Sequence, residues 1–429
     1  MRTSFFLTID KPSDFKKQIL TWAQQFREVV FLDSNNYPGN YSSYDMVLAV
    51  DAFTSIKTDY YNAFEDLKAY QQTTKDWLFG YLSYDLKNDT EVLKSQNFDG
   101  LDFPDLFFFQ PKKLFLLKGN QLEIKYLNMC DDELGEDIEE IQNTNYVSDG
   151  FEVELNIEQR ISKEHYISKV GKMLEHIHRG DIYEANFCME FFSKDAQINP
   201  LDKFLKLNEI SQAPFAVYFK NKNQYLLSAS PERYLKKDGE TIISQPIKGT
   251  SKRFEDKDLD ENAKENLQKD PKERSENIMI VDLVRNDLSR TAQKGSVQVE
   301  ELCQIYSFLQ VHQMISTITS KLDPQYTAVD VIKTTFPMGS MTGAPKISAM
   351  NIIEDLEETK RGLYSGAIGY FTPDGNFDFN VVIRSILYNE ENRYISFSVG
   401  SAITSQSIPE KEYEECLLKA KAMHTVLKS

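Results

Sequence analysis

The chain has 429 residues, of which 41% are hydrophobic and 12% aromatic, so it can bury a large core. Its formal net charge is -17. That charge argues against nucleic acid and against an anionic membrane surface as partners, because affinity for phosphates comes largely from Lys and Arg. A protein this acidic needs local cations if its ligand is also an anion.

Four cysteines form no close pair, so neither a zinc site of the Cys-x-x-Cys type nor a disulfide framework is indicated. The N-terminus leads into only a short apolar stretch, which does not fit a signal peptide. No run approaches the roughly 18 apolar residues of a membrane span. These features predict a protein of the reducing cytoplasm.

Residues 1 to about 125 alternate short, aromatic-rich strands with polar turns, for example at 46–50 and 77–84. An acidic stretch from about residue 131 to 160 is typical of a solvated connector. We therefore divide the chain into an N-terminal part, residues 1–150, and a second region, residues 155–427. We expect the two to be intertwined in one globule.

A helix is predicted after Ser162, which can cap it, with an apolar stripe from Tyr166 to Ile177 and a stop at Gly180. The strand that follows alternates in character. Its apolar face holds Tyr183, Ala185, Phe187, Met189 and Phe191. Its polar face holds Glu184, Asn186, Cys188 and Glu190. Polar side chains on a strand this apolar predict the floor of a cavity.

The later elements mix strands and helices in irregular order. Strands are predicted at 225–228, 241–247, 366–372, 378–387 and 394–399. Helices are predicted at 273–288, 344–355 and 409–427. The absence of a βαβ rhythm favours an α+β fold with large antiparallel sheets.

Lys248 lies in Ser244-Gln-Pro-Ile-Lys-Gly-Thr250, on an apolar strand that runs into Gly-Thr. Burial lowers the pKa of an amine and makes it nucleophilic. The alternative is a lysine that extends from the strand end into solvent. This segment alone leaves both open.

Two helices carry paired carboxylates. Glu273 and Glu276 share one helix face, and Glu412 and Glu415 repeat that spacing on the last helix. Brought together, the two faces offer the oxygen ligands that Mg²⁺ prefers. The alternative is solvated faces, because 66 acidic residues produce many such pairs by chance.

The segment Phe336-Pro-Met-Gly-Ser-Met-Thr-Gly-Ala-Pro-Lys346 is a Gly-rich loop before a predicted helix, where backbone N–H groups can receive an anion. It does not match a Walker loop, and a plain turn with a helix cap is the alternative. Arg384 lies among β-branched residues of a predicted strand. It either pairs with a structural carboxylate or receives a ligand carboxylate.

Two further residues are candidates for proton transfer. Glu232, in Ser230-Pro-Glu-Arg233, is a general acid or base, or a structural partner of its neighbouring arginine. His312 is one of five histidines, and it either faces a ligand or is a satisfied core residue.

Together these segments resemble the chorismate-utilising enzymes. That family includes component I of anthranilate synthase and of aminodeoxychorismate synthase, and the isochorismate and salicylate synthases. The resemblance runs from Gly180 to the final helix. It rests on Ser-Pro-Glu-Arg, Pro-Ile-Lys-Gly-Thr, the stretch 275–287, the Gly-rich loop, Gly-Leu-Tyr-Ser-Gly, Val-Ile-Arg-Ser and Val-Gly-Ser-Ala, in that order. It implies an α+β fold like that of anthranilate synthase component I, with two large, mostly antiparallel sheets in a central sandwich and helices outside.

The resemblance implies a metal site and a substrate site. Glu276 and Glu415 would hold Mg²⁺, with Glu273 and Glu412 beside them, and the ion would bind the ring carboxylate of chorismate. The residues implied to frame the substrate are Gly249, Thr250, Gly400, Ser401 and Ala402.

The remaining implied roles concern the ends of the substrate. Tyr364 and Arg384 would hold the enolpyruvyl carboxylate. Glu232 would act as general acid for departure of the C4 hydroxyl, and His312 would line that site.

Lys248 discriminates within the family, because the anthranilate enzymes carry Ala there and the aminodeoxychorismate synthases carry Lys. The family mechanism has this lysine attack C2 as the C4 hydroxyl leaves. Ammonia then adds at C4 and expels the lysine, which gives 4-amino-4-deoxychorismate for p-aminobenzoate and folate synthesis. The resemblance therefore implies a transaminase-type transferase acting on chorismate.

Two residues depart from the family pattern. Relatives that activate water place Lys at the position of Glu184, and those that add an amine usually place Gln. A carboxylate there is a candidate for binding ammonium on the ammonia path. Ala402 stands where relatives often have Gly.

The chain has no cysteine in the Gly-flanked setting of a glutaminase nucleophile, so a separate glutamine amidotransferase partner is implied. A downstream lyase is implied as well. The alternatives are anthranilate synthase component I and, from another class, a non-catalytic chorismate-binding regulatory subunit.

Overall fold

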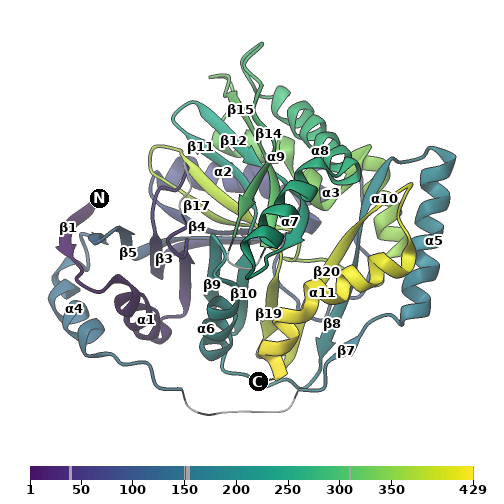
Figure 1. The fold of residues 1–429 in the computed structure, drawn as a ribbon. Helices are drawn as coiled ribbons and strands as arrows, with labels where there is room; N and C mark the ends of the chain where they lie inside the picture. The colour runs from purple at the N-terminus through teal and green to yellow at the C-terminus, as the bar shows by residue number, and fades with distance from the viewer. Residues whose placement is uncertain (38–40, 149, 151–154, 309–310, 429) are drawn as a thin grey trace.

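The computed structural model describes residues 1–37, 41–148, 150, 155–308 and 311–428, and its ribbon is drawn in Figure 1. Within these ranges, no helix combines the length and the apolar character needed to cross a membrane.

The described residues form twenty strands and eleven α-helices. The strands are β1 (Arg2–Thr8), β2 (Glu28–Asp33), β3 (Met46–Thr58), β4 (Leu78–Leu82), β5 (Leu106–Lys118), β6 (Gln121–Leu127), β7 (Glu158–Gln159), β8 (Glu184–Ser193), β9 (Phe215–Asn221), β10 (Gln224–Ser230), β11 (Arg233–Asp238), β12 (Thr241–Gln245), β13 (Ile247–Lys252), β14 (Gln298–Ser307), β15 (Val311–Lys321), β16 (Gly343–Ala344), β17 (Ala367–Phe371), β18 (Phe377–Val381), β19 (Ser385–Asn389) and β20 (Tyr394–Thr404). The helices are α1 (Pro12–Trp22), α2 (Ala63–Thr74), α3 (Lys87–Thr90), α4 (Leu134–Asn143), α5 (Lys163–Arg179), α6 (Pro200–Ser211), α7 (Lys257–Lys269), α8 (Pro271–Ser289), α9 (Ala328–Thr335), α10 (Lys346–Leu356) and α11 (Pro409–Lys428).

Antiparallel pairing joins these strands into one continuous sheet. From β9 the order runs one way through β2, β3, β5, β4, β17, β18, β11 and β12 to β15, which carries β13 and β14. The other way it runs through β10, β19 and β20 to β8. The pairs β2–β9 and β4–β17 each join a strand of residues 1–150 to a strand of the second region.

The sheet folds over on itself to make a two-layered centre. Tyr81 on β4 and Phe219 on β9 are separated by β5, β3 and β2 within the sheet, yet their ring centroids lie 5.3 Å apart. Phe107 of β5 meets the same ring at 6.0 Å. Rings so distant in strand order can touch only across two facing layers, as in a sandwich. The α+β class and the sandwich expected from the sequence are therefore confirmed.

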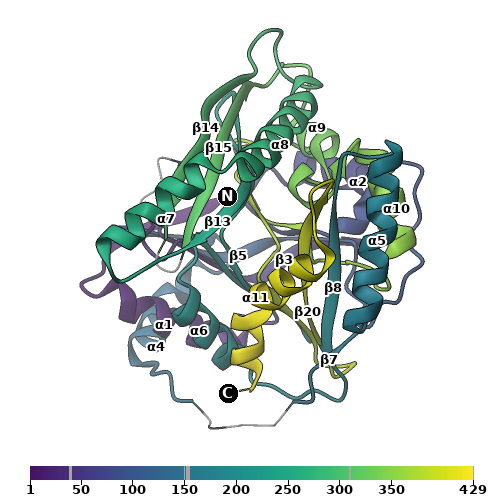
Figure 2. The ribbon, with the colours of Figure 1, turned by 45° about the vertical axis from the view of Figure 1, so that its right-hand side comes forward.

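Helices cover the outside in two groups, which Figure 1 and Figure 2 show from two directions. One core cluster joins α1, α4, α5, α6, α10 and α11 to strands that include β8 and β20. A second joins α2, α8 and α9 to strands that include β4, β11 and β17. Burial of these apolar stripes is the main stabilising contribution to such a fold. It also fixes α8 and α11, which carry the paired carboxylates.

The element predicted after Ser162 is confirmed as α5. The Ser162 side chain accepts a hydrogen bond from the backbone N–H of His165, and Gly180 ends the helix with a φ of 88°. On β8, the side chains from Ala185 to Phe191 that were assigned to the apolar face lie in the core. Tyr183 is an exception, because it precedes the strand and is 69% exposed.

Two predicted boundaries are wrong. The helix predicted from residue 344 begins at Lys346, because Gly343 and Ala344 pair with β8 as the short strand β16. The strand predicted at 378–387 is broken between Val381 and Ser385. The break carries the chain from β17 and β11, which flank β18, to β10 and β20, which flank β19.

The acidic connector predicted at 131–160 lies partly outside the described residues, at 149 and 151–154. The described portion is not simply solvated. Helix α4 packs on the N-terminal part, with Ile141 buried in the core. Asp137 is buried too and accepts hydrogen bonds from Lys113 and Tyr126.

Candidate active site

A cavity of about 720 Å³ lies between β13, β15 and α8 on one side and β20 and α11 on the other. We call it the polar cavity. In Figure 2, α7 and α8 lie above α11. Twelve of the fifteen residues with predicted site roles line it. They are Glu232, Lys248, Gly249, Thr250, Glu273, Glu276, Tyr364, Arg384, Gly400, Ala402, Glu412 and Glu415.

Lys248 projects into this cavity from an irregular part of β13. The register of β13 against β15 shifts between Ile247 and Thr250, and Gly249 has a φ of 94°. A positive φ favours glycine, and a Cβ at Gly249 would lie only 3.1 Å from Oε2 of Glu273. The Lys248 side chain is 11% exposed, so it does not extend into solvent.

The amine of Lys248 is paired rather than free. Its Nζ lies 2.7 Å from Oε1 of Glu184, whose side chain is 1% exposed. Burial alone would lower the pKa of Lys248, as the sequence suggests, but the carboxylates of Glu184, Glu276 and Glu232 outweigh burial and raise it. The expectation of a lowered pKa is therefore wrong, and the resting amine is charged.

Glu232 lies deep in the same cavity, at 3% exposure. Its Oε1 accepts a hydrogen bond from Oγ of Ser340 at 2.7 Å. Burial raises the pKa of Glu232 from 4.5 to about 7, although the Ser340 hydrogen bond and the charge of Lys248 oppose the shift. A carboxyl group that titrates near neutral pH is suited to general acid catalysis.

The carboxylates of α8 and α11 face each other across the cavity, with an ammonium group between them. Nζ of Lys272 lies 3.8 Å from both Glu276 and Glu412. Oε1 of Glu276 is buried and has no hydrogen-bond partner among the described residues, and burial raises the pKa of Glu276 to about 7. A buried carboxylate oxygen without a partner is costly, and a cation would satisfy it.

The geometry does not form a complete metal cage. Among the described residues, no group of three or more His, Cys, Asp or Glu side chains is close enough to hold a metal ion. Glu415 is paired with Lys419 at 2.6 Å, and Glu412 accepts a hydrogen bond from the Ser401 hydroxyl. The donor set suits Mg²⁺ in chemistry, provided that Lys272 gives up its position.

Arg384 lies in the break between β18 and β19, with a φ of 53°, and not inside a strand as predicted. The break turns its side chain into the cavity beside Tyr364. No carboxylate of the described residues lies within 4.0 Å of its guanidinium, which donates a hydrogen bond to the backbone carbonyl of Lys419 at 3.4 Å. Of the two possibilities left open by the sequence, this arrangement fits a ligand carboxylate.

The strand β20 presents its small residues to the cavity. Gly400 pairs with Cys188 of β8, and a Cβ at Gly400 would come within 2.7 Å of the Cys188 sulfur. Ala402 also lines the cavity, opposite Asn186. The side chain of Ser401 points to the other face, where its hydroxyl holds Glu412.

The other two predicted residues do not line the cavity. The Glu184 carboxylate binds the Lys248 amine but does not line the cavity. The ring of His312 is 1% exposed and contacts Ser307 at 2.8 Å and Asp260 at 3.1 Å. The adjacent residue of β15, Gln313, lines the cavity instead, because neighbouring side chains of a strand face opposite ways. A catalytic role for His312 stays a prediction.

The cavity residues without a predicted site role include Lys272, Gln313, Ser340 and Met341. Ser340 and Met341 belong to the Gly-rich loop that the sequence singled out. An anion site at the start of the following helix stays a prediction. The start of α10 is not part of the cavity wall, and Lys346 is instead bound to Asp287. Lys272 was detectable from its spacing of four residues to Glu276.

The buried ion pair of Arg361 and Glu357 holds the Gly-rich loop, residues 336–346, in place. Arg361 and Glu357 form a two-fold hydrogen bond at 2.7 and 2.9 Å. The same guanidinium donates to the carbonyls of Met341 and Asn186 at 2.6 and 2.7 Å. One arginine thus ties the loop to the backbone of β8. Of the four residues on the polar face of β8, Asn186 lines the cavity, so the prediction of a cavity floor holds only in part.

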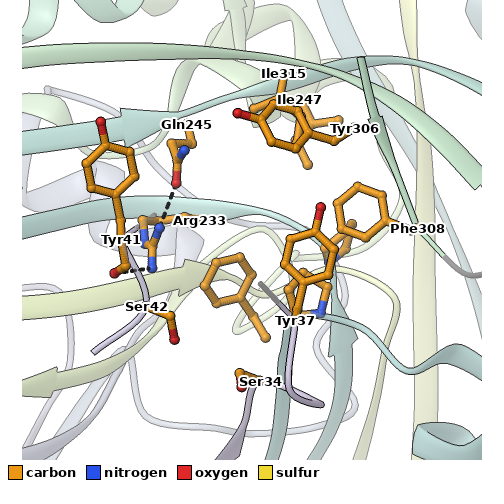
Figure 3. Close-up of a pocket in the computed structure, with 13 residues that line it drawn as sticks. Ser34, Tyr37, Tyr41, Ser42, Arg233, Gln245, Ile247, Tyr306, Phe308 and Ile315 are labelled. Atoms are coloured by element: carbon orange, nitrogen blue, oxygen red, sulfur yellow. Dashed lines mark hydrogen bonds between the residues drawn. The ribbon is translucent and has the colours of Figure 1, made fainter. Parts of the chain in front are cut away.

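A second, smaller cavity of about 100 Å³ adjoins the first and is drawn in Figure 3. Aromatic rings dominate its wall, including Tyr37 and Phe308, which stack with centroids 4.8 Å apart. Arg233 donates to Gln245 at 2.6 Å inside it and is neutralised by Asp378 at 2.9 Å. Pro231 and Ile247 line both cavities.

The fold and the polar cavity define a protein with a site large enough for a small molecule, where an amine, a carboxyl group that titrates near neutral pH and several further carboxylates come together. A family model described as chorismate binding enzyme matches residues 27–425, and the chain belongs to that family.

Individual relatives carry two kinds of names. The chain is 42% identical over 264 residues to aminodeoxychorismate synthase, chloroplastic, of Arabidopsis thaliana, covering 61% of this chain and 28% of that protein. It is 34% identical to an anthranilate synthase component I-like protein of Synechocystis, covering 82% and 72%. It is 32% identical to aminodeoxychorismate synthase component 1 of Bacillus subtilis, covering 81% and 76%.

Among solved structures, anthranilate synthase component I of Streptococcus pneumoniae superimposes with a TM-score of 0.78 at 24% identity, covering 90% of this chain and 95% of that one. This likeness concerns the fold. The chain spans about a quarter of the Arabidopsis relative and about three quarters of the Bacillus relative.

Proposed function

We propose that this chain converts chorismate and ammonia to 4-amino-4-deoxychorismate, as component I of an aminodeoxychorismate synthase in the cytoplasm. The observation that carries the proposal is Lys248, an amine that faces the same cavity as the buried acid Glu232. Relatives named aminodeoxychorismate synthase support it.

Chorismate carries two carboxylates, and two regions of the cavity suit them. Arg384 has no carboxylate partner among the described residues and adjoins Tyr364, so the enolpyruvyl carboxylate would pair with its guanidinium in a fork geometry. The ring carboxylate would face the acidic cluster, beside Gly400 and Ala402. Glycine at position 400 keeps the backbone of β20 open to close approach.

Glu276 would be the principal ligand of Mg²⁺, because its buried oxygen has no partner, and Glu273, Glu412 and Glu415 would complete or orient the site. The ion supplies positive charge for the ring carboxylate. Lys272, which lies between Glu276 and Glu412, would move aside.

The reaction proceeds by two displacements. Nζ of Lys248 forms a bond to C2 while the C4–O bond breaks, and Glu232 gives its proton to the departing hydroxyl, which leaves as water. Ammonia then bonds to C4, the C2–N bond to Lys248 breaks, and the proton lost by the new amine returns to Glu232. The net change is chorismate plus ammonia to aminodeoxychorismate plus water.

A glutamine amidotransferase subunit would supply the ammonia. The role of Glu184 on the ammonia path stays a prediction.

The test is product identification with the purified chain, chorismate, Mg²⁺ and an ammonium salt. Aminodeoxychorismate is expected by mass spectrometry, and p-aminobenzoate after addition of a lyase. Anthranilate as the main product without lyase would show that the chain is an anthranilate synthase. Chorismate binding without turnover would favour a regulatory subunit. A Lys248→Ala variant that kept full C4 amination would contradict the covalent route.

A further inference from the structure

Glu184 and Lys248 form an ion pair in which the carboxylate is fully buried and the amine nearly so. The Lys248 amine is 2.7 Å from Oε1, and the two side chains are 11% and 1% exposed. The second oxygen, Oε2, is buried and has no hydrogen-bond partner among the described residues. A buried carboxylate oxygen without a hydrogen-bond partner is costly, so this oxygen is open to a new interaction next to the Lys248 amine.

Lys248 must lose a proton before it can attack carbon. It rests in the charged form because several carboxylates surround it. The acidic groups that act on it are Glu184 of β8, Glu232 after β10, Glu273 and Glu276 of α8, and Glu415 of α11. Of the basic residues on those helices, Lys272 and Lys419 are the two that lie within 4.0 Å of the cluster carboxylates among the described contacts.

Only Glu184 of these acids is within hydrogen-bond distance of the amine among the described contacts. Glu232 is bound to Ser340, and the carboxylates of α8 and α11 are associated with Lys272 or Lys419. Glu184 also contributes no wall to the polar cavity, so it is placed to act on the lysine rather than on the substrate.

We propose that Glu184 is the proton acceptor that activates Lys248. This inference rests on the proposed function and deepens it. When chorismate fills the cavity, it displaces the water that reaches the 11% of Lys248 still exposed. In that dry state the neutral pair of amine and carboxylic acid carries a smaller desolvation cost than the ion pair.

The proton transfers among Lys248, Glu184 and Glu232 balance over one turnover. The Lys248 ammonium gives one proton to Glu184, and the resulting amine uses its lone pair to bond to C2. The bonded nitrogen stays a secondary ammonium, Glu232 gives its proton to the leaving hydroxyl, and Glu232 later regains a proton from the new amine at C4. When ammonia expels the lysine from C2, the neutral amine takes its proton back from Glu184. Neither an oxidant nor a further reactant is needed.

The decisive variant is Glu184→Gln. The amide keeps an oxygen that can accept a hydrogen bond from Lys248, and it is the residue that amine-adding relatives usually carry, so the fold should tolerate it. Glu190→Gln is the matched control, because Glu190 lies on the same strand, is buried, and pairs with Arg160 at 3.0 Å away from the cavity.

Two measurements together separate a proton acceptor from a mere counter-ion. The first is the pH dependence of the reactivity of Lys248 toward an amine-acylating reagent, followed by peptide mass spectrometry without substrate. In Glu184→Gln the pKa of Lys248 should fall, since a carboxylate that raises it is gone. More of the lysine is then neutral at pH 7.

The second is the single-turnover rate of chorismate consumption with saturating ammonium. A proton acceptor typically contributes about 100-fold or more, so Glu184→Gln should be slower by about that factor at pH 7, even though more of its lysine is neutral. Between pH 5.5 and 7 the wild-type rate should be nearly constant, and the variant rate should rise about tenfold per pH unit as solvent deprotonates the lysine.

The outcomes are distinct. A variant as fast as the wild type, or faster, with a lowered Lys248 pKa would reduce Glu184 to a counter-ion and overturn the inference. An unchanged Lys248 pKa would overturn the ion pair itself. Glu190→Gln should change neither measurement. If the wild-type protein forms no aminated product, the proposed function fails, and the acylation experiment still reports on the pair.

Discussion

Replacement of Glu232 by Gln should make the protein more stable at neutral pH while removing most of its activity. Burial raises the pKa of Glu232 from 4.5 to about 7. Between those values the unfolded chain releases the proton and the folded chain keeps it. The unfolded state therefore binds fewer protons, and stability falls as the pH rises through this window.

The size of the effect follows from the gap in pKa. A difference of about 2.5 pH units corresponds to about 3 kcal/mol that the folded protein loses between pH 4.5 and pH 7. A neutral amide in place of Glu232 avoids this loss, and its carbonyl can still accept the Ser340 hydrogen bond. Because the two amide N–H groups bring their own desolvation cost, the expected gain at pH 8 is about 1 to 3 kcal/mol.

Calorimetric melting of the wild type and of Glu232→Gln at pH 4.5 and pH 8 measures this difference in stability. The variant should melt higher than the wild type at pH 8 and no higher at pH 4.5. Its turnover should fall by about 100-fold or more, because a general acid is lost. Wild-type turnover should decline as the pH rises through 7, where Glu232 loses its proton. The reasoning is refuted if the melting difference is the same at both pH values.

Ser340 provides an independent check on the same group. Its hydrogen bond to Glu232 lowers the carboxyl pKa against the effect of burial. In Ser340→Ala the pKa should rise further, so the decline in turnover should begin at a higher pH. A decline that moves to lower pH would mean that the hydroxyl does not stabilise the carboxylate.

Three more outcomes are expected. Arg384→Lys should raise the KM for chorismate about 10- to 100-fold with a smaller effect on kcat, because a fork of charge-assisted hydrogen bonds is lost; an unchanged KM would place the enolpyruvyl carboxylate elsewhere. Gly400→Ala should lower the free energy of unfolding by about 1 to 3 kcal/mol through overpacking, since the new Cβ would lie 2.7 Å from the Cys188 sulfur. The added change Cys188→Ala should restore most of the lost stability, and no restoration would point to a different clash. Chelation should abolish turnover and Mg²⁺ should restore it, with Glu276→Gln needing about tenfold more Mg²⁺; equal Mg²⁺ dependence would remove Glu276 from the metal site.

The sequence predicted best those features that depend on local pattern. The helix from Ser162 to Gly180 has a cap, an apolar stripe and a stop, and all three are local signals. The carboxylate pairs were visible from their spacing, and the apolar face of β8 from its alternation. These signals depend on neighbouring residues, so they survive without knowledge of the tertiary fold.

Features that depend on distant partners could not be predicted in the same way. Arg384 was assigned to a strand because its neighbours are β-branched, and only the passage from one layer to the other explains the break and its positive φ. The pKa of Lys248 was expected to fall with burial. It rises, because Glu184 approaches from a strand 64 positions away. His312 and Gln313 differ by one position, so a single step in register decides which faces the cavity.

The charge of the polar cavity differs in sign from that of the whole molecule. The chain has a net charge of -17, yet six Lys and Arg residues line the cavity against five glutamates. Two of those lysines, at 252 and 421, are exposed at its margin, where they can attract an anion. Deeper inside, Lys248, Lys272 and Lys419 are each within 4.0 Å of a carboxylate.

Arg384 is therefore the deep cation that has no carboxylate within that distance among the described residues, and it can serve one carboxylate of chorismate. The second carboxylate would meet the acidic cluster of α8 and α11 with no free positive charge beside it. Bringing an anion next to buried Glu276 without compensation would be strongly unfavourable. A divalent cation resolves this conflict, because it satisfies the unpaired oxygen of Glu276 and neutralises the incoming carboxylate together. The charge distribution of the cavity thus supports the proposed Mg²⁺ site, as does the identity of its acidic residues.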